Sequence, residues 1–335
     1  MARVTVLGAG AWGTALAVVL AGNGHEVVLC PRRRALLSEL RLGRQNTAYL
    51  PGVTLPPTVG LCDDWQAAAR RADVVVMAVP SRFARAAMAP AAPAIGQETV
   101  IVSVVKGVED GEPPRTMTQV LGELVAQHAG LAVLSGPGFA SEVARRKPAA
   151  LVAAAERAEL AENVQKLFAS PTLRVYRSGD VAGVELAAAA KNVIAIATGI
   201  SDGLELGLSA RAALITRGLA ELGRLAVAKG AKLETVAGLA GLGDLVLTCT
   251  GALSRNRALG LRLARARAGD AAQPDHSAPA AVAEGQTTAR AVARIAEQCG
   301  VEMPIVSAVC RVLYEGASPG AMVEELLSRS LKPEF

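Results

Sequence analysis

The feature that most constrains the fold of this chain is a glycine loop close to its N-terminus. The apolar segment Arg3 to Leu7 predicts a short strand, which runs directly into the loop Gly8-Ala9-Gly10-Ala11-Trp12-Gly13. The loop fits the pattern G-x-G-x-x-G, and the stretch Thr14 to Leu20 that follows predicts a helix. This order is typical of a dinucleotide-binding unit, in which the pyrophosphate lies at the helix N-terminus.

Each glycine of the loop has a separate physical task in such a unit. Gly8 allows the tight turn, Gly10 lets the backbone approach a pyrophosphate, and Gly13 permits close packing of helix on strand. A glycine turn without a ligand remains the alternative interpretation at this point.

Further apolar runs extend the same architecture. The segments Glu26 to Cys30, Asp73 to Val79, Thr99 to Val105 and Leu131 to Leu134 predict strands that are covered on both faces. Helix-like segments rich in Ala and Leu separate them. Alternating buried strands and helices predict a doubly wound, mostly parallel sheet.

The pattern changes after about residue 178, and no strand is predicted from Val181 onward. Helical periodicity dominates there, over residues 184–198, 210–229, 255–267, 288–299, 304–315 and 321–328. We therefore predict two domains. Residues 1–178 form an α/β, Rossmann-like dinucleotide-binding domain, and residues 179–335 form an all-α substrate and catalytic domain.

Composition excludes several classes of function. No apolar stretch reaches the roughly 20 uninterrupted residues of a membrane helix, and the N-terminus has no signal-peptide pattern, so we expect a cytoplasmic protein without membrane insertion. The net charge of +5 is too small and too dispersed to predict nucleic-acid binding. The five cysteines form no C-x-x-C pair, which argues against a structural metal site.

The end of the second predicted strand bears on the choice of nicotinamide cofactor. An acidic residue there would bind the ribose 2′-hydroxyl of NAD, but this strand ends Leu29-Cys30-Pro31 and continues with Arg32-Arg33-Arg34. Arginines at this place can bind a 2′-phosphate by charge-assisted hydrogen bonds. The sequence therefore favours NADP(H), with NAD(H) possible and a solvated basic run as the alternative.

Two lysines lie in unusual surroundings. Lys191 follows Ala187 to Ala190 and precedes Asn192-Val193-Ile194, so it interrupts an apolar helix. Burial would lower its pKa and let it exchange a proton near neutral pH, although a lysine that only snorkels to the surface fits as well. Lys106 follows a predicted parallel strand, at the sheet edge where ligands bind in this architecture, with an ordinary loop lysine as the alternative.

A third cluster combines an acid with a helix start. Asp244 lies among glycines and aliphatic residues in the segment Gly238 to Thr250, where it could serve the site or cap a helix. Ser254 is a plausible N-cap for the next helix. Together with Arg255 and Asn256, the free N–H groups of that helix could bind a phosphate, although ordinary capping beside surface arginines is the alternative.

Taken together, these segments resemble the NAD(P)-dependent glycerol-3-phosphate dehydrogenase family in its bacterial form, over nearly the whole chain. The motifs that carry the resemblance include GAGAWGTALA (8–17), NTAYLP (46–51), VVKGVE (104–109), SGPGFASE (135–142), KNVIAIATGISDG (191–203), AGLAGLGDLVLTCT (237–250), SRNR (254–257) and AEGQTT (283–288).

The resemblance implies a role for each matching residue. Lys191 would be the general acid/base, and no metal would be needed. The substrate would be bound by Lys106, Gly136, Gly138, Asn192, Asp244, Thr248, Ser254, Arg255 and Asn256. The cofactor would be contacted by Gly8, Gly10, Ala11, Trp12, Gly13, Arg32, Arg33, Tyr49, Lys106, Ala140, Arg255, Val282 and Glu284.

Two positions depart from the family pattern. The family usually has Ser or Thr where this chain has Gly138, so one substrate-facing hydroxyl is missing. Ala11 likewise leaves one hydroxyl contact absent. Neither change affects the proton donor that the resemblance implies.

The expected activity is the reversible, NAD(P)H-dependent reduction of dihydroxyacetone phosphate to sn-glycerol 3-phosphate, which would supply phospholipid synthesis. The apolar helices of the second domain could form a homodimer. Two alternatives remain at this point: a related hydroxyacid dehydrogenase of the same two-domain type, and a module that senses NAD(P) without chemistry. The latter would explain the glycine loop but not the combination of Lys106, Lys191, Asp244 and Arg255.

Overall fold

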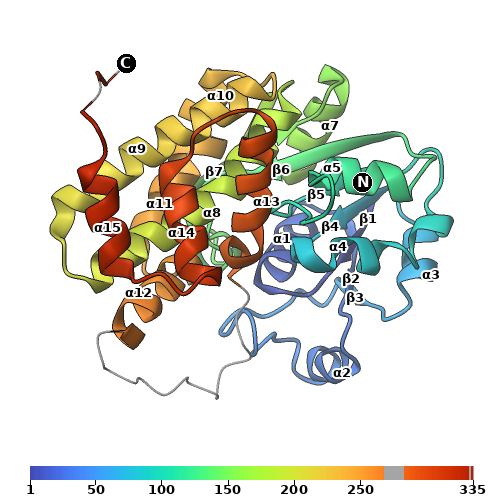
Figure 1. Ribbon diagram of the computed structural model, residues 1–335. Coiled ribbons are helices and arrows are strands. Elements are labelled where there is room, and N and C mark those ends of the chain that lie inside the picture. The colour runs from blue at the N-terminus through green and yellow to red at the C-terminus, as the bar shows by residue number, and fades with distance from the viewer. Residues whose placement is uncertain (268–282, 332, 335) are drawn as a thin grey trace.

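The computed structural model of the protein describes residues 1–267, 283–331 and 333–334. All strands of the described residues lie in the first part of the chain, and helices make up the second part (Figure 1). The strands are β1 (Arg3–Leu7), β2 (Glu26–Cys30), β3 (Gly60–Leu61), β4 (Val74–Met77), β5 (Val100–Ser103), β6 (Gly130–Ser135), β7 (Ala149–Ala154) and β8 (Leu173–Ser178).

These strands form one sheet with the order β3-β2-β1-β4-β5-β6-β7-β8 over the described residues. Every neighbouring pair is parallel except β6 and β7, which run antiparallel. The strand order reverses between β1 and β4, which is the place where ligands bind in open sheets of this type. The predicted doubly wound, mostly parallel sheet is confirmed.

The strands β3, β7 and β8 were not predicted. β7 is the Ala-rich segment AALVAA, whose composition favours a helix as much as a strand. β8 lies at the sheet edge and alternates buried with exposed residues, so it lacks the continuous apolar run of the central strands. β3 has only two residues.

Helices cover both faces of the sheet. They are α1 (Ala11–Gly22), α2 (Arg34–Gly43), α3 (Trp65–Arg70), α4 (Ser81–Met88), the 3₁₀ turn η1 (Ala92–Ala94), α5 (Met117–Leu124), α6 (Ala140–Ala144) and α7 (Ala158–Phe168). On one face Val6 packs with α1 and α7, and on the other Leu7 packs with α3, α4 and α5. This alternation follows from the two-residue period of a strand.

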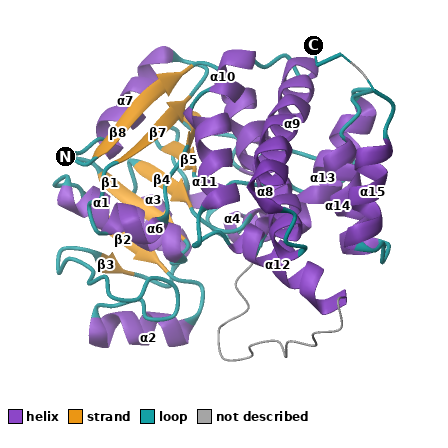
Figure 2. Cartoon of the chain, turned by 90° about the vertical axis from the view of Figure 1, so that its left-hand side faces the viewer, coloured by secondary structure: helices purple, strands orange, loops and turns teal. Residues whose placement is uncertain are grey.

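The second part is built around one long helix. It comprises α8 (Val181–Gly203), α9 (Gly207–Ala228), α10 (Leu233–Ala237), the π-helical turn η2 (Leu239–Gly243), α11 (Asp244–Thr250), α12 (Arg255–Arg267), α13 (Glu284–Gln298), α14 (Pro304–Tyr314) and α15 (Pro319–Ser328). The sheet lies on one side and these helices on the other, with α8 among them (Figure 2). The short elements α10, η2 and α11 were not predicted.

Two stretches of the described residues are long and apolar enough to cross a membrane by length and composition. They are α8 itself and the segment Leu233–Thr250. The α8 window is 89% buried inside the protein, as the central helix of a helical domain would be. α8 also makes the close approach to α12, because Gly199 and Gly260 let the two backbones touch.

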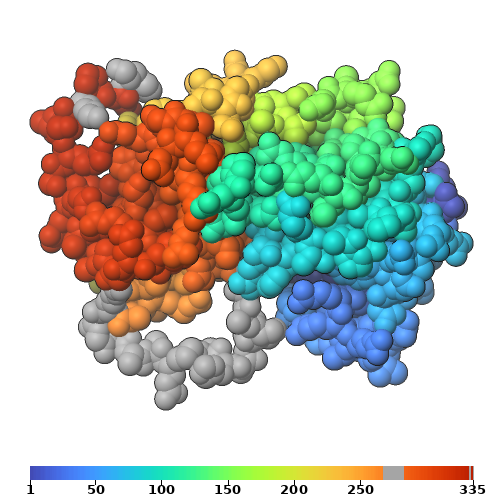
Figure 3. All heavy atoms as spheres, turned by 45° about the vertical axis from the view of Figure 1, so that its right-hand side comes forward, coloured from blue at the N-terminus to red at the C-terminus, as the bar shows by residue number. Residues whose placement is uncertain are grey.

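The two parts pack against each other along a broad surface. Figure 3 shows the C-terminal helices in contact with the first half of the chain. Hydrogen bonds cross this surface from two buried residues of α8: Asn192 donates to the carbonyl of Lys106, and Glu185 accepts from the start of α5. The ion pair between Lys106 and Asp244 crosses it as well.

Candidate active site

The glycine loop joins β1 to α1 at the carboxyl end of the parallel strands. Gly8 has a φ of +109°, and a Cβ there would lie 2.7 Å from the carbonyl oxygen of Ala78. A Cβ on Gly13 would lie 2.0 Å from the carbonyl oxygen of Gly8, so neither position admits a side chain. An added Cβ on Gly10 would meet no atom within 4 Å, so packing does not require glycine there. Close approach of a phosphate to the N–H groups of α1 does require it.

Two further observations fit a dinucleotide at this loop. The fully buried Asn46, from the NTAYLP segment, donates from Nδ2 to the carbonyl of Ala9 (2.9 Å) and to Oγ1 of Thr14 (2.8 Å). Asn46 therefore holds the glycine loop and the first turn of α1 in place. The indole N–H of Trp12 is buried and has no partner among the described residues. A buried donor without a partner is costly, so a ligand group that accepts from it would stabilise the site.

Basic and aromatic side chains gather beyond the end of β2. Arg33 donates to the hydroxyl of Tyr49, and its guanidinium lies 5.3 Å from the centre of the Tyr49 ring. Arg32 lies 5.2 Å from the centre of the Phe83 ring, which Arg82 also approaches. Arg32 and Arg33 are exposed, and no acidic residue ends β2. The structure thus brings Arg33 against Tyr49 and Arg32 against Phe83, and Phe83 and Arg82 are additions that the sequence did not reveal.

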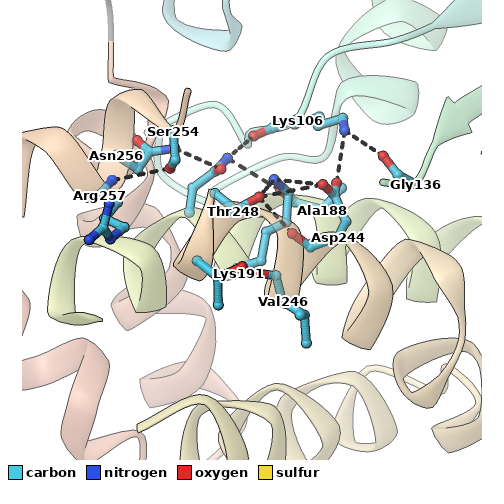
Figure 4. Close-up of polar contacts among 12 residues, drawn as sticks. Lys106, Gly136, Ala188, Lys191, Asp244, Val246, Thr248, Ser254, Asn256 and Arg257 are labelled. Carbon is cyan, nitrogen blue, oxygen red and sulfur yellow. Dashed lines mark hydrogen bonds and ion pairs between the residues drawn. The ribbon is translucent and has the colours of Figure 1, made fainter. Parts of the chain in front are cut away.

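Two lysines and one aspartate form the centre of the site (Figure 4). Lys106 extends from the loop after β5 and places Nζ 2.8 Å from Oδ2 of Asp244. Lys191 extends from α8 and places Nζ 3.2 Å from Oδ1 of the same carboxylate. Lys191 is 4% exposed and Asp244 is 2% exposed, so this charge cluster is nearly cut off from solvent. Burial on this scale is stable only because the opposite charges are paired.

The position of Asp244 depends on the glycines before it. The chain makes the π-helical turn η2 and continues directly into α11, whose first residue is Asp244. A Cβ on Gly241 would lie 1.9 Å from the carbonyl oxygen of Val236, so the turn can pack only with glycine there. Single π-helical turns of this kind occur often at functional sites. The carboxylate of Asp244 pairs with lysines and caps no helix, so the helix-cap alternative for this residue is wrong.

Lys191 has the environment of a group that exchanges a proton. Burial lowers the pKa of its ammonium to about 8, against the opposing effect of Asp244, and the positive charge of Lys106 adds to the lowering. Its Nζ donates to Oγ1 of Thr248 (2.7 Å), and that hydroxyl donates to the backbone carbonyl of Asp244 (2.6 Å). Lys191 therefore does not snorkel to the surface.

The SGPGFASE segment forms another wall of the site. The carbonyl oxygen of Gly136 accepts from Lys106 Nζ at 2.8 Å, and Gly136 has a φ of +126°. A Cβ on Gly138 would lie 3.3 Å from the edge of the Trp12 indole, so this glycine lies directly against the glycine-loop tryptophan. Lys106 Nζ is 5.7 Å from the centre of the same indole.

A chain of side-chain amides connects four segments around the lysines. The backbone N–H of Gly285 donates to Oδ1 of Asn256 (3.0 Å), and Asn256 Nδ2 donates to Oδ1 of Asn192 (2.8 Å). Asn192 Nδ2 then donates to the carbonyl of Lys106 (2.7 Å). Both asparagines are buried. The two amides therefore hold α8, α12, α13 and the Lys106 loop in a fixed relation.

The start of α12 combines a side-chain N-cap with an exposed arginine. Ser254 precedes the helix, and its Oγ accepts from the backbone N–H of Arg257 (3.2 Å), so the predicted N-cap is confirmed. Arg255 is exposed at the first position of the helix. Arg257 instead points to Asp202 (2.6 Å), which also binds Arg211 and so fixes the helix start against α8.

The remaining predicted cofactor residues lie at the edges of the glycine loop and at the contact between the two parts. Ala11 is the first residue of α1, and Ala140 begins α6 and packs near Trp12. Glu284 begins α13, and its Oε1 accepts from the backbone N–H of Ser81 at the start of α4. Val282 lies outside the described residues.

Six of the nine predicted substrate residues form one network with Lys191, whereas Gly138, Ser254 and Arg255 are not joined to it by a side-chain hydrogen bond or ion pair among the described residues. Connected by hydrogen bonds or ion pairs are Lys106, Gly136, Lys191, Asn192, Asp244, Thr248 and Asn256. Sequence reasoning missed Asp202 and Glu185, although both are acids in the long apolar helix. That is the signal that singled out Lys191, and it could have found them.

Comparison with known proteins gives consistent matches over the whole chain. The model described as NAD-dependent glycerol-3-phosphate dehydrogenase N-terminus matches residues 3–161, and the one described as its C-terminus matches residues 180–324. The glycerol-3-phosphate dehydrogenase (NAD(P)+) of Anaeromyxobacter dehalogenans is 48% identical, over 99% of this chain and 100% of that protein. The enzyme of the same name from Thiobacillus denitrificans is also 48% identical, with the same coverage. The crystal structure of glycerol-3-phosphate dehydrogenase from Coxiella burnetii matches with a TM-score of 0.91 and 39% identity, over 98% of this chain and 99% of that one.

Proposed function

This chain belongs to the NAD-dependent glycerol-3-phosphate dehydrogenase family, and from that premise we propose that Lys191 exchanges the proton in its reaction. The enzyme interconverts dihydroxyacetone phosphate and sn-glycerol 3-phosphate with NAD(P)(H). The observation that carries the proposal is the buried Lys191 beside Asp244 and Lys106, with a pKa lowered by burial to about 8.

In the reducing direction, the bound nicotinamide supplies the hydride that adds to the carbonyl carbon. The protonated Lys191 stabilises the negative charge that develops on the carbonyl oxygen and donates its proton to that oxygen. In the reverse direction, neutral Lys191 removes the proton of the alcohol. A pKa near the working pH suits both directions, because each protonation state is well populated.

The neighbours of Lys191 position it and the substrate. Asp244 and the hydroxyl of Thr248 aim the Lys191 ammonium, and Lys106 adds a second positive charge at the reacting end. The carbonyls and N–H groups around Gly136 and Gly138 line the substrate from the sheet side.

The phosphate of the substrate lies at the start of α12 in this proposal. The free N–H groups of the helix and the guanidinium of Arg255 would bind it, while Ser254 caps the helix. Asn256 and Asn192 contribute mainly by fixing the surrounding segments, because their amides are already engaged with each other. Binding energy at this remote end places the carbonyl against Lys191.

The proposal also gives cofactor-binding roles to the residues that match the family's cofactor site. Gly8, Gly10, Ala11 and Gly13 hold the pyrophosphate at α1, and Trp12 offers its unpartnered indole N–H. Ala140, Glu284 and Val282 complete the cofactor side in this proposal, with Lys106 and Arg255 contacting both ligands.

Lys191→Ala tests the catalytic role. We expect kcat for reduction of dihydroxyacetone phosphate to fall by about 10²–10⁴-fold, with NADPH binding retained, because a general acid typically contributes that much. Absorbance of the reduced nicotinamide measures the first quantity and fluorescence titration the second. Turnover by the variant within about tenfold of the wild type would refute the role.

We further propose that the enzyme prefers NADP(H), because Arg32 and Arg33 lie where a 2′-phosphate would bind and no acid ends β2. Arg32→Ala and Arg33→Ala should each lower kcat/KM with NADPH by about tenfold and change that with NADH little. Arg34→Ala is the matched control, since its side chain is 93% exposed and lies near Asp63. Equal losses with both cofactors, or a wild type that favours NADH, would contradict the preference.

The proposal also covers the assembly and location of the protein. We propose that the two domains divide between residues 178 and 179, because β8 ends at Ser178 and α8 begins at Val181.

A homodimer through the helical domain is supported by exposed apolar side chains such as Leu208 and Val227, and light scattering after gel filtration would test it. The protein would be cytoplasmic, without membrane insertion or nucleic-acid binding, and would supply glycerol phosphate for phospholipid synthesis.

A further inference from the structure

We propose that Glu185 is a positioning residue of the reaction, which fixes Lys106 in the site by holding the far end of the β5–α5 loop (residues 104–116) against α8. The inference rests on the proposed role of Lys106 in substrate binding. Glu185 does not itself touch the reacting groups; it acts through the loop that carries Lys106.

The contact between Glu185 and α5 is buried and well formed. Oε1 of Glu185 accepts from the backbone N–H of Thr118 (2.8 Å), and Oε2 accepts from the hydroxyl of the same residue (2.6 Å). Glu185 is 4% exposed, and burial raises the pKa of its carboxyl, against the opposing effect of these hydrogen bonds. A buried acid of this kind is retained only where its hydrogen bonds are made, so the contact is specific.

The partner of Glu185 belongs to a rigid part of the sheet domain. Thr118 lies in the first turn of α5, where backbone N–H groups have no partner within the helix. The same helix buries Met117, Val120 and Leu121 in the core against the sheet. Glu185 therefore ties α8 to the body of the first domain.

The near end of the loop is tied to the same face of α8. The side chain of Asn192 donates to the carbonyl of Lys106 at 2.7 Å. Positions 185 and 192 are seven residues apart, which on an α-helix is almost two full turns and about 10.5 Å along the axis. The two contacts thus hold both ends of the loop on one helix face, and the spacing sets where Lys106 reaches Asp244.

Val108 of the loop also packs in the core of the helical part with side chains of α8, but this apolar contact has no fixed direction. The other polar tethers of the loop are exposed or do not reach α8. Arg294 of α13 pairs with Asp110 (3.1 Å), but both side chains are partly exposed, and exposed pairs of this kind contribute little. Arg85 pairs with Glu109 (2.8 Å) within the first domain, so it does not relate the loop to α8. Among the described residues 104–118, the side-chain hydrogen bonds to α8 are the one from Thr118 to Glu185 and the one from Asn192 to the carbonyl of Lys106.

Glu185→Gln tests the inference with purified enzyme, dihydroxyacetone phosphate and NADPH. The amide keeps the shape but cannot accept from both Thr118 donors. We expect kcat/KM for dihydroxyacetone phosphate to fall about tenfold, mostly through KM, because one buried acceptor is lost and the segment that carries Lys106 is released. KM does not depend on the fraction of active enzyme, so a merely structural role would leave it unchanged.

Glu221→Gln is the matched control. Glu221 lies within α9 and is a second buried acid. Its carboxylate accepts from the backbone N–H groups of Ile305 and Val306 at the start of α14, so its hydrogen bonds do not go to the loop that carries Lys106. This variant should keep KM within about twofold of the wild type. Equal changes of KM in the two variants would overturn the inference, as would an unchanged KM in Glu185→Gln.

Variants at Thr118 and Lys106 separate the possible failures. Thr118→Val removes one donor and should raise KM about threefold, whereas Thr118→Ser keeps both donors and should restore it. This pair of variants tests the inference if Glu185→Gln does not fold.

In Lys106→Ala enzyme, the effect of Glu185→Gln on KM should disappear. If Lys106→Ala alone leaves KM unchanged, the proposed role of Lys106 fails; if it raises KM and Glu185→Gln does not, only the present inference fails.

Discussion

Replacing Asp244 by Asn should move the pH range in which the enzyme reduces dihydroxyacetone phosphate. Asp244 is the carboxylate nearest to Lys191, at 3.2 Å, and it favours the protonated form of a lysine whose pKa burial lowers to about 8. The amide of Asn fills nearly the same volume without the charge. Burial and the charge of Lys106 then act on Lys191 without opposition, so its pKa falls further.

The magnitude follows from the change in protonated fraction. With a pKa of about 8, Lys191 is about three quarters protonated at pH 7.5. Loss of an opposite charge at this distance shifts a pKa by about 1–3 units, so a value of about 6 is expected for the variant. Only about 3% of the lysine would then be protonated at pH 7.5, and kcat/KM for reduction would fall about 25-fold.

The assay is the pH dependence of kcat/KM for dihydroxyacetone phosphate, which reports the pKa of the free enzyme. The alkaline limb should move from about pH 8 to about pH 6, and activity should recover on acidification. Loss of the Lys106 ion pair lowers the plateau as well, so the position of the limb is the decisive quantity. Ionisation of the substrate phosphate affects both proteins equally.

Asp202→Asn supplies the control for that experiment. Asp202 is another buried carboxylate, paired with Arg211 (2.5 Å) and Arg257 (2.6 Å), but Lys191 is not among its partners. Its loss should raise KM by loosening α12 and leave the limb in place. A limb at the same pH in Asp244→Asn and the wild type would refute the assignment of the limb to Lys191.

Three other substitutions test helix packing, the titration of a buried acid and the support of the glycine loop. Gly260→Ala would place a Cβ 2.1 Å from the carbonyl oxygen of Ile196, so it should destabilise the fold by about 1–3 kcal/mol in thermal unfolding, while Gly179→Ala, with nothing within 4 Å, should not. Burial raises the pKa of Glu221 from 4.5 to about 7, so stability declines as the pH rises through this interval, and Glu221→Gln should remove about 3 kcal/mol of that decline in denaturant titrations at several pH values. Asn46→Ala removes the donor that fixes the glycine loop and should weaken NADPH binding in a fluorescence titration by about tenfold, and an unchanged Kd would contradict that role.

The central strands could be predicted from the sequence because a strand that is buried on both faces is a nearly continuous run of apolar residues. β4 is a continuous apolar run, and β1 and β2 are apolar apart from Arg3, Thr5 and Glu26. β7 and β8 could not be recognised in this way. β7 is rich in Ala, and β8 lies at the sheet edge and alternates buried with exposed residues. Only the pairing across the sheet decides that they are strands, and pairing is a property of distant segments.

The site was predictable to a similar extent and for a similar reason. Lys191 and Asp244 stood out because a charge among apolar residues is costly unless it is paired or used. The free-energy cost of such a charge can be inferred from the residues next to it in the sequence. The partner that offsets this cost cannot, since Lys106 and Asp244 are 138 positions apart. The two arginines on Phe83 and the bond from Asn192 to the Lys106 loop are likewise visible only in the fold.

Glu185 shows how far that reasoning can be carried. It lies in the same apolar helix as Lys191, six residues earlier, and the same cost applies to it. A helix that is buried on nearly all sides can keep two such charges only if other segments reach it with complementary groups. Lys191 is met by Asp244 and Thr248, and Glu185 by the start of α5. Of these groups, Glu185 is the one whose partner lies in the first part of the chain, because Asp244 and Thr248 belong to α11 of the helical part. Glu185 therefore marks where the two parts meet, and a shift of α5 along α8 would leave its buried carboxyl without a partner. That coupling is the reason we expect a change at Glu185 to appear in the binding of a substrate that Glu185 does not touch.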